Sequence, residues 1–265
     1  MIDFEYKDSY GVYDLARVVE ILRGPGGCPW DAEQTHQSIR RNFLEETYEV
    51  CEAIDEGSPE HLREELGDVL LQVLFHAQIE KEEERFNLDD VADGVTRKLI
   101  FRHPHVFGDV QVSGSEQVLT NWDELKRVEK NQARYADTVD SVARSLPSLW
   151  RAEKVQKKAK KAGFDWPDVS GAMDKLAEET DELRTAIRED SNVAEELGDL
   201  LFAAVNVARY AGVDPEDALH AACDKFSRRF RLVEDKAIAQ GKDMKEMPLA
   251  ELDKLWDEAK QDLKA

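Results

Sequence analysis

The sequence predicts an all-α protein built from two tandem helical repeats. Apolar residues recur at helical spacing along most of the chain, as Val12, Leu15, Val18, Val19 and Leu22 do near its start. No stretch alternates between apolar and polar residues in the manner of a half-buried strand. An acidic motif also occurs twice in the same order, which indicates that one helical unit has been duplicated.

Glycine and proline residues divide the first half into helices. The segment 24–29 contains three glycines and two prolines and ends the first helix, whereas Pro59 suits the first position of a new one. The predicted helices cover residues 11–23, 35–54, 59–84, 88–102 and 118–129. The stretch 108–114 is expected to be a loop.

The second half repeats this plan after a polar and weakly patterned segment. Its predicted helices cover residues 149–162, 173–188, 192–210, 216–240 and 249–263. We therefore predict an N-terminal repeat at residues 1–129, a linker at 130–148 and a C-terminal repeat at 149–265.

The composition narrows the classes of function. The net charge of −21 gives an acidic surface that repels a phosphate backbone, so stable nucleic-acid binding is not expected. Cys28, Cys51 and Cys223 form no CxxC pair, which favours free thiols in a reducing compartment. No apolar run approaches the roughly 20 residues that span a bilayer. These features predict a cytoplasmic protein without a membrane segment.

The repeated acidic motif places two pairs of carboxylates on successive helices, because residues three apart share one helix face. In the first repeat the pairs are Glu46 with Glu49 and Glu65 with Asp68; in the second they are Glu179 with Glu182 and Glu196 with Asp199. Four converging carboxylates repel one another unless a cation lies between them. The motif therefore predicts a divalent metal site in each repeat.

The helix that carries the second pair is apolar around nearly its whole circumference in both repeats, which predicts that it is buried. Burial of an unpaired carboxylate is costly, so these acids need a partner. An isolated ExxE pair in so acidic a chain would more often be a solvated helix face, but the duplication favours a metal site. Oxygen ligands without imidazole favour Mg²⁺, with Mn²⁺ as a possible substitute. A di-iron site would need ExxH motifs, and the one ExxH pair, Glu33 with His36, is not duplicated.

Cationic and aromatic residues recur on the helices that follow. Lys98 and Arg102 correspond to Lys225 and Arg229, and Trp122 and Lys126 correspond to Trp256 and Lys260. Beside a metal ion, the cations could bind phosphate, Arg through its bidentate fork and Lys as a point charge. Ordinary surface charge remains the alternative for the cations. A tryptophan could stack on a base, although a place in the core is the commoner role for such a residue.

With these residues assembled, the chain closely resembles the MazG family of nucleoside triphosphate pyrophosphohydrolases over nearly its full length. The strings that carry the resemblance, besides both EExxE…ExxD motifs, are Gly-Gly-Cys-Pro-Trp-Asp at 26–31, Gln-Thr-His at 34–36, His-Pro-His-Val-Phe at 103–107, Gly-Phe-Asp-Trp at 163–166 and Lys-Phe-Ser-Arg-Arg-Phe at 225–230. Other all-α pyrophosphatases share the acidic motif alone. The tandem arrangement and the flanking strings favour MazG.

The resemblance implies helical units that assemble as homodimers and hydrolyse NTPs and dNTPs to nucleoside monophosphate and pyrophosphate with Mg²⁺, in nucleotide-pool control or house-cleaning. It implies that Glu179, Glu182, Glu196 and Asp199 hold the metal, that Lys225, Arg229 and Lys260 contact the triphosphate, and that Trp256 contacts the nucleoside. Every corresponding residue is present in the first repeat, namely Glu46, Glu49, Glu65, Asp68, Lys98, Arg102, Trp122 and Lys126. In that family the C-terminal repeat carries the activity, and whether the N-terminal repeat is active, silent or regulatory stays open.

The expected chemistry is attack of a metal-activated water on the α-phosphate. Glu178, and Glu45 in the first repeat, adjoin the metal ligands and are candidates to orient or deprotonate that water. Two alternatives remain open: a non-catalytic acidic helical dimer that regulates by binding nucleotide or protein, and a pyrophosphatase restricted to dUTP or dCTP.

Overall fold

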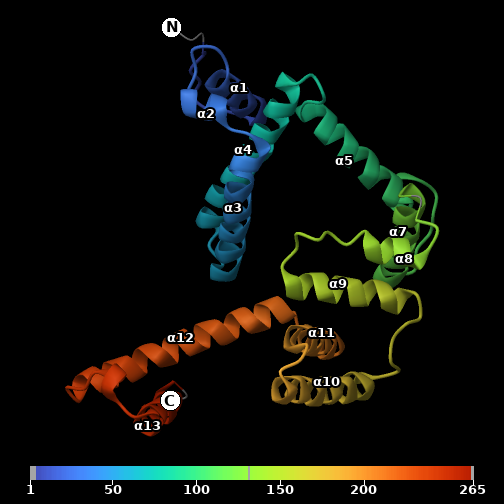
Figure 1. The fold of residues 1–265 in the computed structure, drawn as a ribbon. Coiled ribbons are helices and arrows are strands. Elements are labelled where there is room, and N and C mark those ends of the chain that lie inside the picture. The colour runs from blue at the N-terminus through green and yellow to red at the C-terminus, as the bar shows by residue number, and fades with distance from the viewer. Residues whose placement is uncertain (1–3, 131, 264–265) are drawn as a thin grey trace. The chain divides into compact units, whose positions relative to one another are not determined.

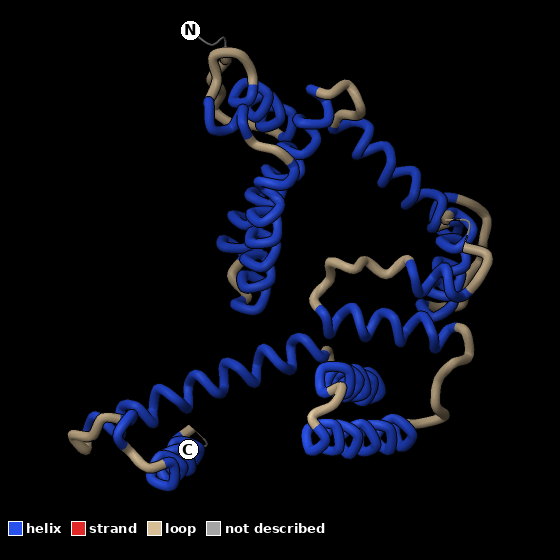
Figure 2. The backbone as a smooth tube through the Cα atoms, viewed as in Figure 1, coloured by secondary structure: helices blue, strands red, loops and turns tan. Residues whose placement is uncertain are grey.

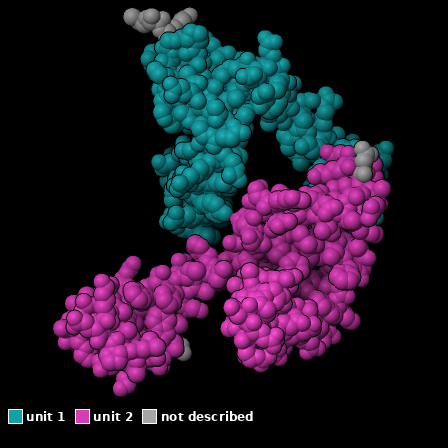
Figure 3. All heavy atoms as spheres, in the orientation of Figure 1, with its two compact units in different colours: residues 1–126 teal, residues 127–265 magenta. Residues whose placement is uncertain are grey.

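The computed structural model describes residues 4–130 and 132–263, and these residues form helices joined by loops, with no strand among them (Figure 2). The chain divides into two compact units, residues 1–126 and residues 127–265 (Figure 3). None of the helices in the described part of the chain combines the length and apolar character required to cross a bilayer. All three cysteines are free.

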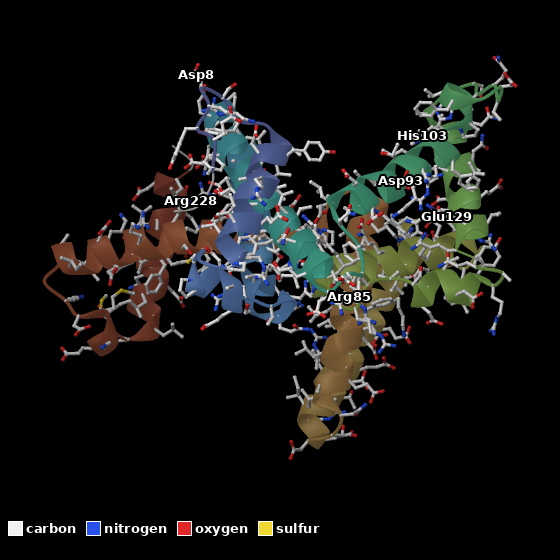
Figure 4. All side chains as sticks on the ribbon, turned by 90° about the horizontal axis from the view of Figure 1, so that it is seen from above. Asp8, Arg85, Asp93, His103, Glu129 and Arg228 are labelled. Carbon is white, nitrogen blue, oxygen red and sulfur yellow. The ribbon has the colours of Figure 1, made fainter. Side chains whose placement is uncertain are left out.

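The first unit is organised around an antiparallel pair of long helices, α3 and α4 (Figure 1). Its helices are α1 (Val12–Arg23), α2 (Pro29–Glu33), α3 (His36–Glu56), α4 (Pro59–Glu82), α5 (Leu88–Arg102), α6 (Pro104–Phe107) and α7 (Ser115–Glu129), the last of which continues into the second unit. Helix α1 packs against α4, and α5 leads away from α4. In Figure 4 Asp93 marks α5 and His103 marks its C-terminal end, where the His103 Nδ1 atom lies 2.6 Å from the Leu99 carbonyl oxygen.

The local sequence determines where α3 and α4 begin and end. The Thr35 side chain accepts a hydrogen bond from the backbone N–H of Ser38 at the start of α3. Gly57 ends α3 in the left-handed conformation with φ of 65°, which glycine adopts without a steric penalty. Ser58 then caps α4, and Pro59 occupies its first turn. Because the connection is this short, the two helices are forced to be antiparallel neighbours.

The core of the first unit lies at the end of the α3–α4 pair that is remote from this turn. It contains Val19 from α1, Ile39 from α3, and Leu74, Phe75 and Ile79 from α4. The acidic motif lies on both helices between this core and the turn. The core and the turn therefore fix the two helices on either side of the carboxylates.

The second unit contains a second antiparallel pair, α10 and α11 (Figure 1). Its elements are α8 (Tyr135–Asp140), α9 (Ser148–Lys161), α10 (Val169–Glu189), α11 (Val193–Ala211), α12 (Pro215–Ala239), the short 3₁₀ helix η1 (Met244–Glu246) and α13 (Leu249–Asp262). Helix α9 packs against α11, and α13 packs against α12. The contact between α12 and α13 is a separate small core of Val233, Ala237, Leu255 and Ala259.

Every helix predicted from the sequence is present, with small shifts at the ends, and the all-α prediction is confirmed. Three short α-helices, α2, α6 and α8, and the 3₁₀ helix η1 were not predicted. Helix α8 lies inside the segment predicted to be a linker. The structural division at 126/127 falls within α7, and the boundaries proposed at 129 and 149 stay a prediction.

The prediction that α4 and α11 are buried around their circumference is wrong for the single chain. Leu66 on α4 is 51% exposed, and on α11 Leu197, Leu201 and Phe202 are 45%, 49% and 44% exposed. Each helix packs mainly against its antiparallel partner and against α1 or α9, with a smaller contact to α5 or α12, and this cover leaves the named apolar side chains exposed. The sequence pattern reports that a face is apolar and does not report what covers it.

The loop before α10 is fastened to α11 by an ion pair. Arg209 of α11 is 5% exposed and contacts Asp165 through both terminal nitrogens, at 3.0 and 2.5 Å. The Tyr210 hydroxyl donates a hydrogen bond to the Trp166 carbonyl oxygen at 2.6 Å. Burial raises the pKa of Asp165, but the opposing causes, of which the hydrogen bonds from Arg209 are the largest, outweigh it and hold that pKa below its usual value.

We expect Asp165→Asn to lower the free energy of unfolding of the second unit by about 3 kcal/mol at neutral pH, because it leaves the buried Arg209 charge without its carboxylate. The depressed pKa means that this stabilisation is present above the unfolded-state pKa of Asp165 and disappears as the pH falls through its folded-state pKa. Urea unfolding at a series of pH values measures both effects.

Asp181→Asn is the matched control, because it removes an ion pair with Arg184 in which both side chains are 74% exposed. Such exposed pairs contribute about 1 kcal/mol or less. Equal losses of stability in the two variants would contradict an anchoring role for Asp165.

Candidate metal centres

Helices α3 and α4 bring the first acidic motif together. One carboxylate oxygen each from Glu46, Glu49 and Glu65 lies within 4.8 Å of the others. Asp68 lies outside this group, yet its charge raises the pKa of Glu46. The structure therefore gathers three of the four predicted ligands of the first repeat and places the fourth within electrostatic range.

The carboxylates of the first unit repel one another. Burial raises the pKa of Glu46, and the charges of Asp68, Glu49 and Glu65 raise it further. Glu65 is only 9% exposed. Its contact with His61 Nε2, at 3.1 Å, supplies a full counter-charge only when that imidazole is protonated.

Helices α10 and α11 bring the second motif together in the same way. Glu179, Glu196 and Asp199 each place one carboxylate oxygen within 4.8 Å of the others. Glu182 lies outside this group, but burial and then the charge of Glu179 raise its pKa. Both units thus contain a group of three carboxylates, contributed by two antiparallel helices.

Glu179 shows that the second group suits a cation. Its residue is 5% exposed, and its Oε2 atom is buried without a hydrogen-bond partner among the described residues. A buried carboxylate oxygen without a partner is costly, and a cation is the partner that removes the cost. Because all three side chains offer carboxylate oxygen, the donors fit a hard divalent ion such as Mg²⁺ or Mn²⁺.

A groove of about 450 Å³ opens beside this second group, between α10 and α11. Glu182 and Glu196 line it together with Glu178, Asp181 and Asn192. A strongly acidic groove of this kind would admit a phosphorylated ligand only with cations present.

Three residues next to the carboxylates were missed at the sequence level. Lys175 lies 2.6 Å from Glu179, the Asn192 side chain donates to Glu196 at 2.7 Å, and His61 contacts Glu65. Each precedes its glutamate by four residues. Helical i,i+4 spacing was the available signal, and it is too common in so acidic a chain to have singled these residues out.

The two candidate water-orienting residues lie on exposed helix faces. Glu178 is 2.8 Å from Lys175, and Glu45 is 2.8 Å from Arg41. Their side chains are 56% and 50% exposed. Neither belongs to the three-carboxylate group beside it.

The structure also groups the predicted cations with their tryptophans. In the first unit Arg102 and Lys126 lie over the Trp122 ring, 5.4 and 5.3 Å from its centre. In the second unit Arg229 lies 5.8 Å from the centre of the Trp256 ring.

The surroundings of Trp256 combine core and surface. Trp256 packs against the core between α12 and α13, and the Phe226 ring centre lies 5.1 Å away. Lys260 pairs with Asp257 at 2.9 Å. Trp256 therefore contributes to the packing of the core between α12 and α13, which is the alternative that the sequence left open.

In the second unit the predicted phosphate-binding cations do not contact the carboxylates. No ion pair among the described residues joins Lys225, Arg229 or Lys260 to Glu179, Glu196 or Asp199. Helix α12 leads away from the α10–α11 pair, as α5, which carries Lys98, leads away from α3 and α4 (Figure 1). Arg228, labelled in Figure 4, is exposed beside Arg229 on α12.

Comparison with known proteins identifies both acidic groups with one family. The family model of the MazG nucleotide pyrophosphohydrolase domain matches residues 34–107 and 168–233. The first match contains the α3–α4 carboxylates, and the second contains those of α10 and α11 together with Lys225 and Arg229.

Relatives of similar length carry names that describe an activity. The chain is 43% identical over 251 residues to the nucleoside triphosphate pyrophosphohydrolase of Escherichia coli K12, covering 93% of this chain and 95% of that protein. It is 42% identical over 247 residues to the nucleoside triphosphate pyrophosphohydrolase/pyrophosphatase MazG of Thermotoga maritima, covering 93% and 94%. It is also 49% identical over 247 residues to the uncharacterized protein YabN of Bacillus subtilis, of which it spans 50%.

The two carboxylate groups predict two separable classes of bound divalent ion. We expect Glu65→Gln and Glu196→Gln each to abolish one class of bound Mn²⁺, and the double variant to abolish both, because each change replaces a charged carboxylate ligand with a neutral amide. Electron paramagnetic resonance of free Mn²⁺ measures the occupancy without nucleotide.

Glu116→Gln, at an exposed site on α7, is the control and should bind as the unmodified protein does. Full Mn²⁺ binding by the Glu65→Gln, Glu196→Gln double variant would rule out these groups as the metal centres.

Proposed function

The chain belongs to the MazG nucleotide pyrophosphohydrolase family, and from this we propose that it hydrolyses NTPs and dNTPs to nucleoside monophosphate and pyrophosphate in a Mg²⁺-dependent reaction. The observation that carries the proposal is the buried Glu179, whose unpartnered oxygen lies in a group of three carboxylates within the matched residues. The cellular role of this reaction would be nucleotide-pool control or house-cleaning in the cytoplasm.

The residues that would hold the metal are the carboxylates of the two motifs: Glu179, Glu182, Glu196 and Asp199, and Glu46, Glu49, Glu65 and Asp68. When bound, a divalent ion supplies charge neutralisation for the triphosphate and lowers the pKa of a coordinated water. Mn²⁺ is a plausible substitute because it also prefers oxygen ligands.

The remaining polar residues would bind and orient the substrate. Arg229 offers two parallel N–H donors to a phosphate, while Lys225 and Lys260 offer point charges. Trp256 would contact the nucleoside through the part of its ring that the core leaves uncovered. Glu178, with Glu45 in the first repeat, would orient or deprotonate the water that attacks the α-phosphorus, and pyrophosphate would leave.

We further propose that the chain functions as a homodimer. Exposed apolar side chains follow α11 and α12, among them Leu201, Phe202, Phe226 and Phe230, the last two at 57% and 44% exposure. Large apolar side chains that stay exposed on successive helices support an interaction face. A second copy of the chain would cover it and complete the helical bundle of each repeat.

We expect Glu196→Gln combined with Asp199→Asn to remove most NTP-dependent pyrophosphate release, because both changes remove charge from the C-terminal metal centre. A loss of roughly 100-fold or more in kcat is typical when metal-based charge stabilisation fails. The measurement is pyrophosphate release with Mg²⁺ against a panel of canonical, deoxy and modified nucleoside triphosphates.

The matched variant Glu65→Gln with Asp68→Asn tests the N-terminal repeat. Full activity in the C-terminal double variant would move the active site to the first repeat. Nucleotide binding without turnover of any substrate in the unmodified protein would favour the alternative of a non-catalytic regulator.

We expect Leu201→Glu combined with Phe202→Glu to convert the dimer into monomers, because each change places a charge on an apolar face that the second copy covers. Sedimentation velocity measures the change. Ile187→Glu, at another exposed apolar site on α10, is the comparison variant. A monomeric unmodified protein would contradict the dimer proposal.

A further inference from the structure

A lysine lies against the C-terminal carboxylates. Lys175 Nζ is 2.6 Å from Glu179 Oε1 and 2.8 Å from Glu178 Oε1. The Glu179 side chain is 7% exposed, so the ion pair is shielded from water on the carboxylate side. The most buried carboxylate of the group therefore already has a permanent cationic partner within the chain.

The N-terminal carboxylates have no equivalent lysine. Lys175 precedes Glu179 by four residues, and the residue four places before Glu46 is Asn42. An asparagine side chain carries no charge and cannot neutralise a carboxylate. In the first unit Glu65 contacts His61, which lies on the same helix, α4. In the second unit the corresponding contact of Glu196 is with the neutral Asn192.

The two units therefore contain the same four motif carboxylates in different electrostatic surroundings, and different members of the motif form the close group of three. A divalent ion bound through the unpartnered Oε2 atom of Glu179 would share this carboxylate with the Lys175 ammonium on Oε1. Two cations a few ångströms apart repel each other strongly in a partly buried site. Metal binding at the C-terminal group is therefore opposed by the charge of the Lys175 ammonium, whereas no lysine among the described residues pairs with the N-terminal group.

We propose that Lys175 is a resident counter-cation that lowers the affinity of the C-terminal centre for divalent metal, so that the N-terminal centre fills at a lower metal concentration. The proposal rests on the proposed function in that both carboxylate groups are metal centres. It makes Lys175 a positioning residue for the carboxylates of the metal-free protein. A rise in free metal then fills the two centres in sequence, although both repeats carry the same acidic motif.

The experiment exchanges the two residues and measures each centre alone. In a Glu65→Gln background, in which the N-terminal centre is disabled, Lys175→Asn should tighten Mn²⁺ binding by about tenfold, as expected for removal of one nearby charge. In a Glu196→Gln background, Asn42→Lys should weaken Mn²⁺ binding by a similar factor. Electron paramagnetic resonance gives both affinities with the metal alone and no nucleotide.

Two variants separate the charge from other effects. Lys175→Arg retains the charge and should retain the original affinity. Lys157→Asn removes a different i,i+4 ion pair, with Glu153 at 2.6 Å on α9, and should leave Mn²⁺ binding unchanged. Thermal unfolding is a second readout: with chelator, Lys175→Asn should lower the Tm, and Mn²⁺ should then raise the Tm by more than in the unmodified protein.

Unchanged or weaker Mn²⁺ binding in Lys175→Asn, in a protein that circular dichroism shows to be folded, would overturn the proposal. This failure is distinct from that of the proposed function. Normal pyrophosphate release without the affinity change refutes only the role of Lys175, and the affinity change without pyrophosphate release refutes only the enzymatic proposal.

Discussion

Repulsion between carboxylates on adjacent antiparallel helices is the constraint on which the arrangement of both units depends. The raised pKa of Glu46 reports that repulsion in the first unit, where burial and three neighbouring acids all act in the same direction. The helices stay together because they are fixed elsewhere. In the first unit the Gly57 turn lies at one end and the core around Leu74 at the other. In the second unit, the buried pair of Arg209 and Asp165 fastens the entry of α10 to α11.

Much of this arrangement follows from the sequence, because the features that build it are local. Helical periodicity, the caps at Thr35 and Ser58 and the short turn at Gly57 are enough to predict two antiparallel neighbours. The ExxE and ExxD spacings then place the carboxylates on facing surfaces. Exposure of Leu66 and Leu201 was not predictable in this way, because a run of apolar residues does not reveal whether its cover belongs to the same chain.

The positions of the cationic residues in the site could likewise be predicted from the sequence only in part. Sequence order correctly assigns Lys225 and Arg229 to the helix after the second acidic pair, but α12 leads away from that pair and packs Trp256 against its own small core. Trp256 lies against the Arg229 guanidinium, whose Nε atom is buried without a hydrogen-bond partner among the described residues. Because the cations lie apart from the carboxylates, the residues proposed to bind phosphate do not neutralise the metal-free carboxylate groups. In the proposed homodimer a second copy of the chain would bring the two sets together, with the exposed apolar side chains of α11 and α12 at the contact.

Lys175 shows why a duplicated motif need not mean a duplicated function. Selection for metal ligands acts on the carboxylates themselves, whereas affinity depends on every charge within a few ångströms. The residue four places before the first ligand is free to differ, and here it differs by a full charge between Asn42 and Lys175. Lys242 and Lys254 also precede a glutamate by four places, so the spacing alone does not single out Lys175. The burial of Glu179 is what gives its pair with Lys175 an effect on metal affinity. A lysine beside an exposed glutamate competes mainly with water, whereas a lysine beside a buried glutamate competes with the metal.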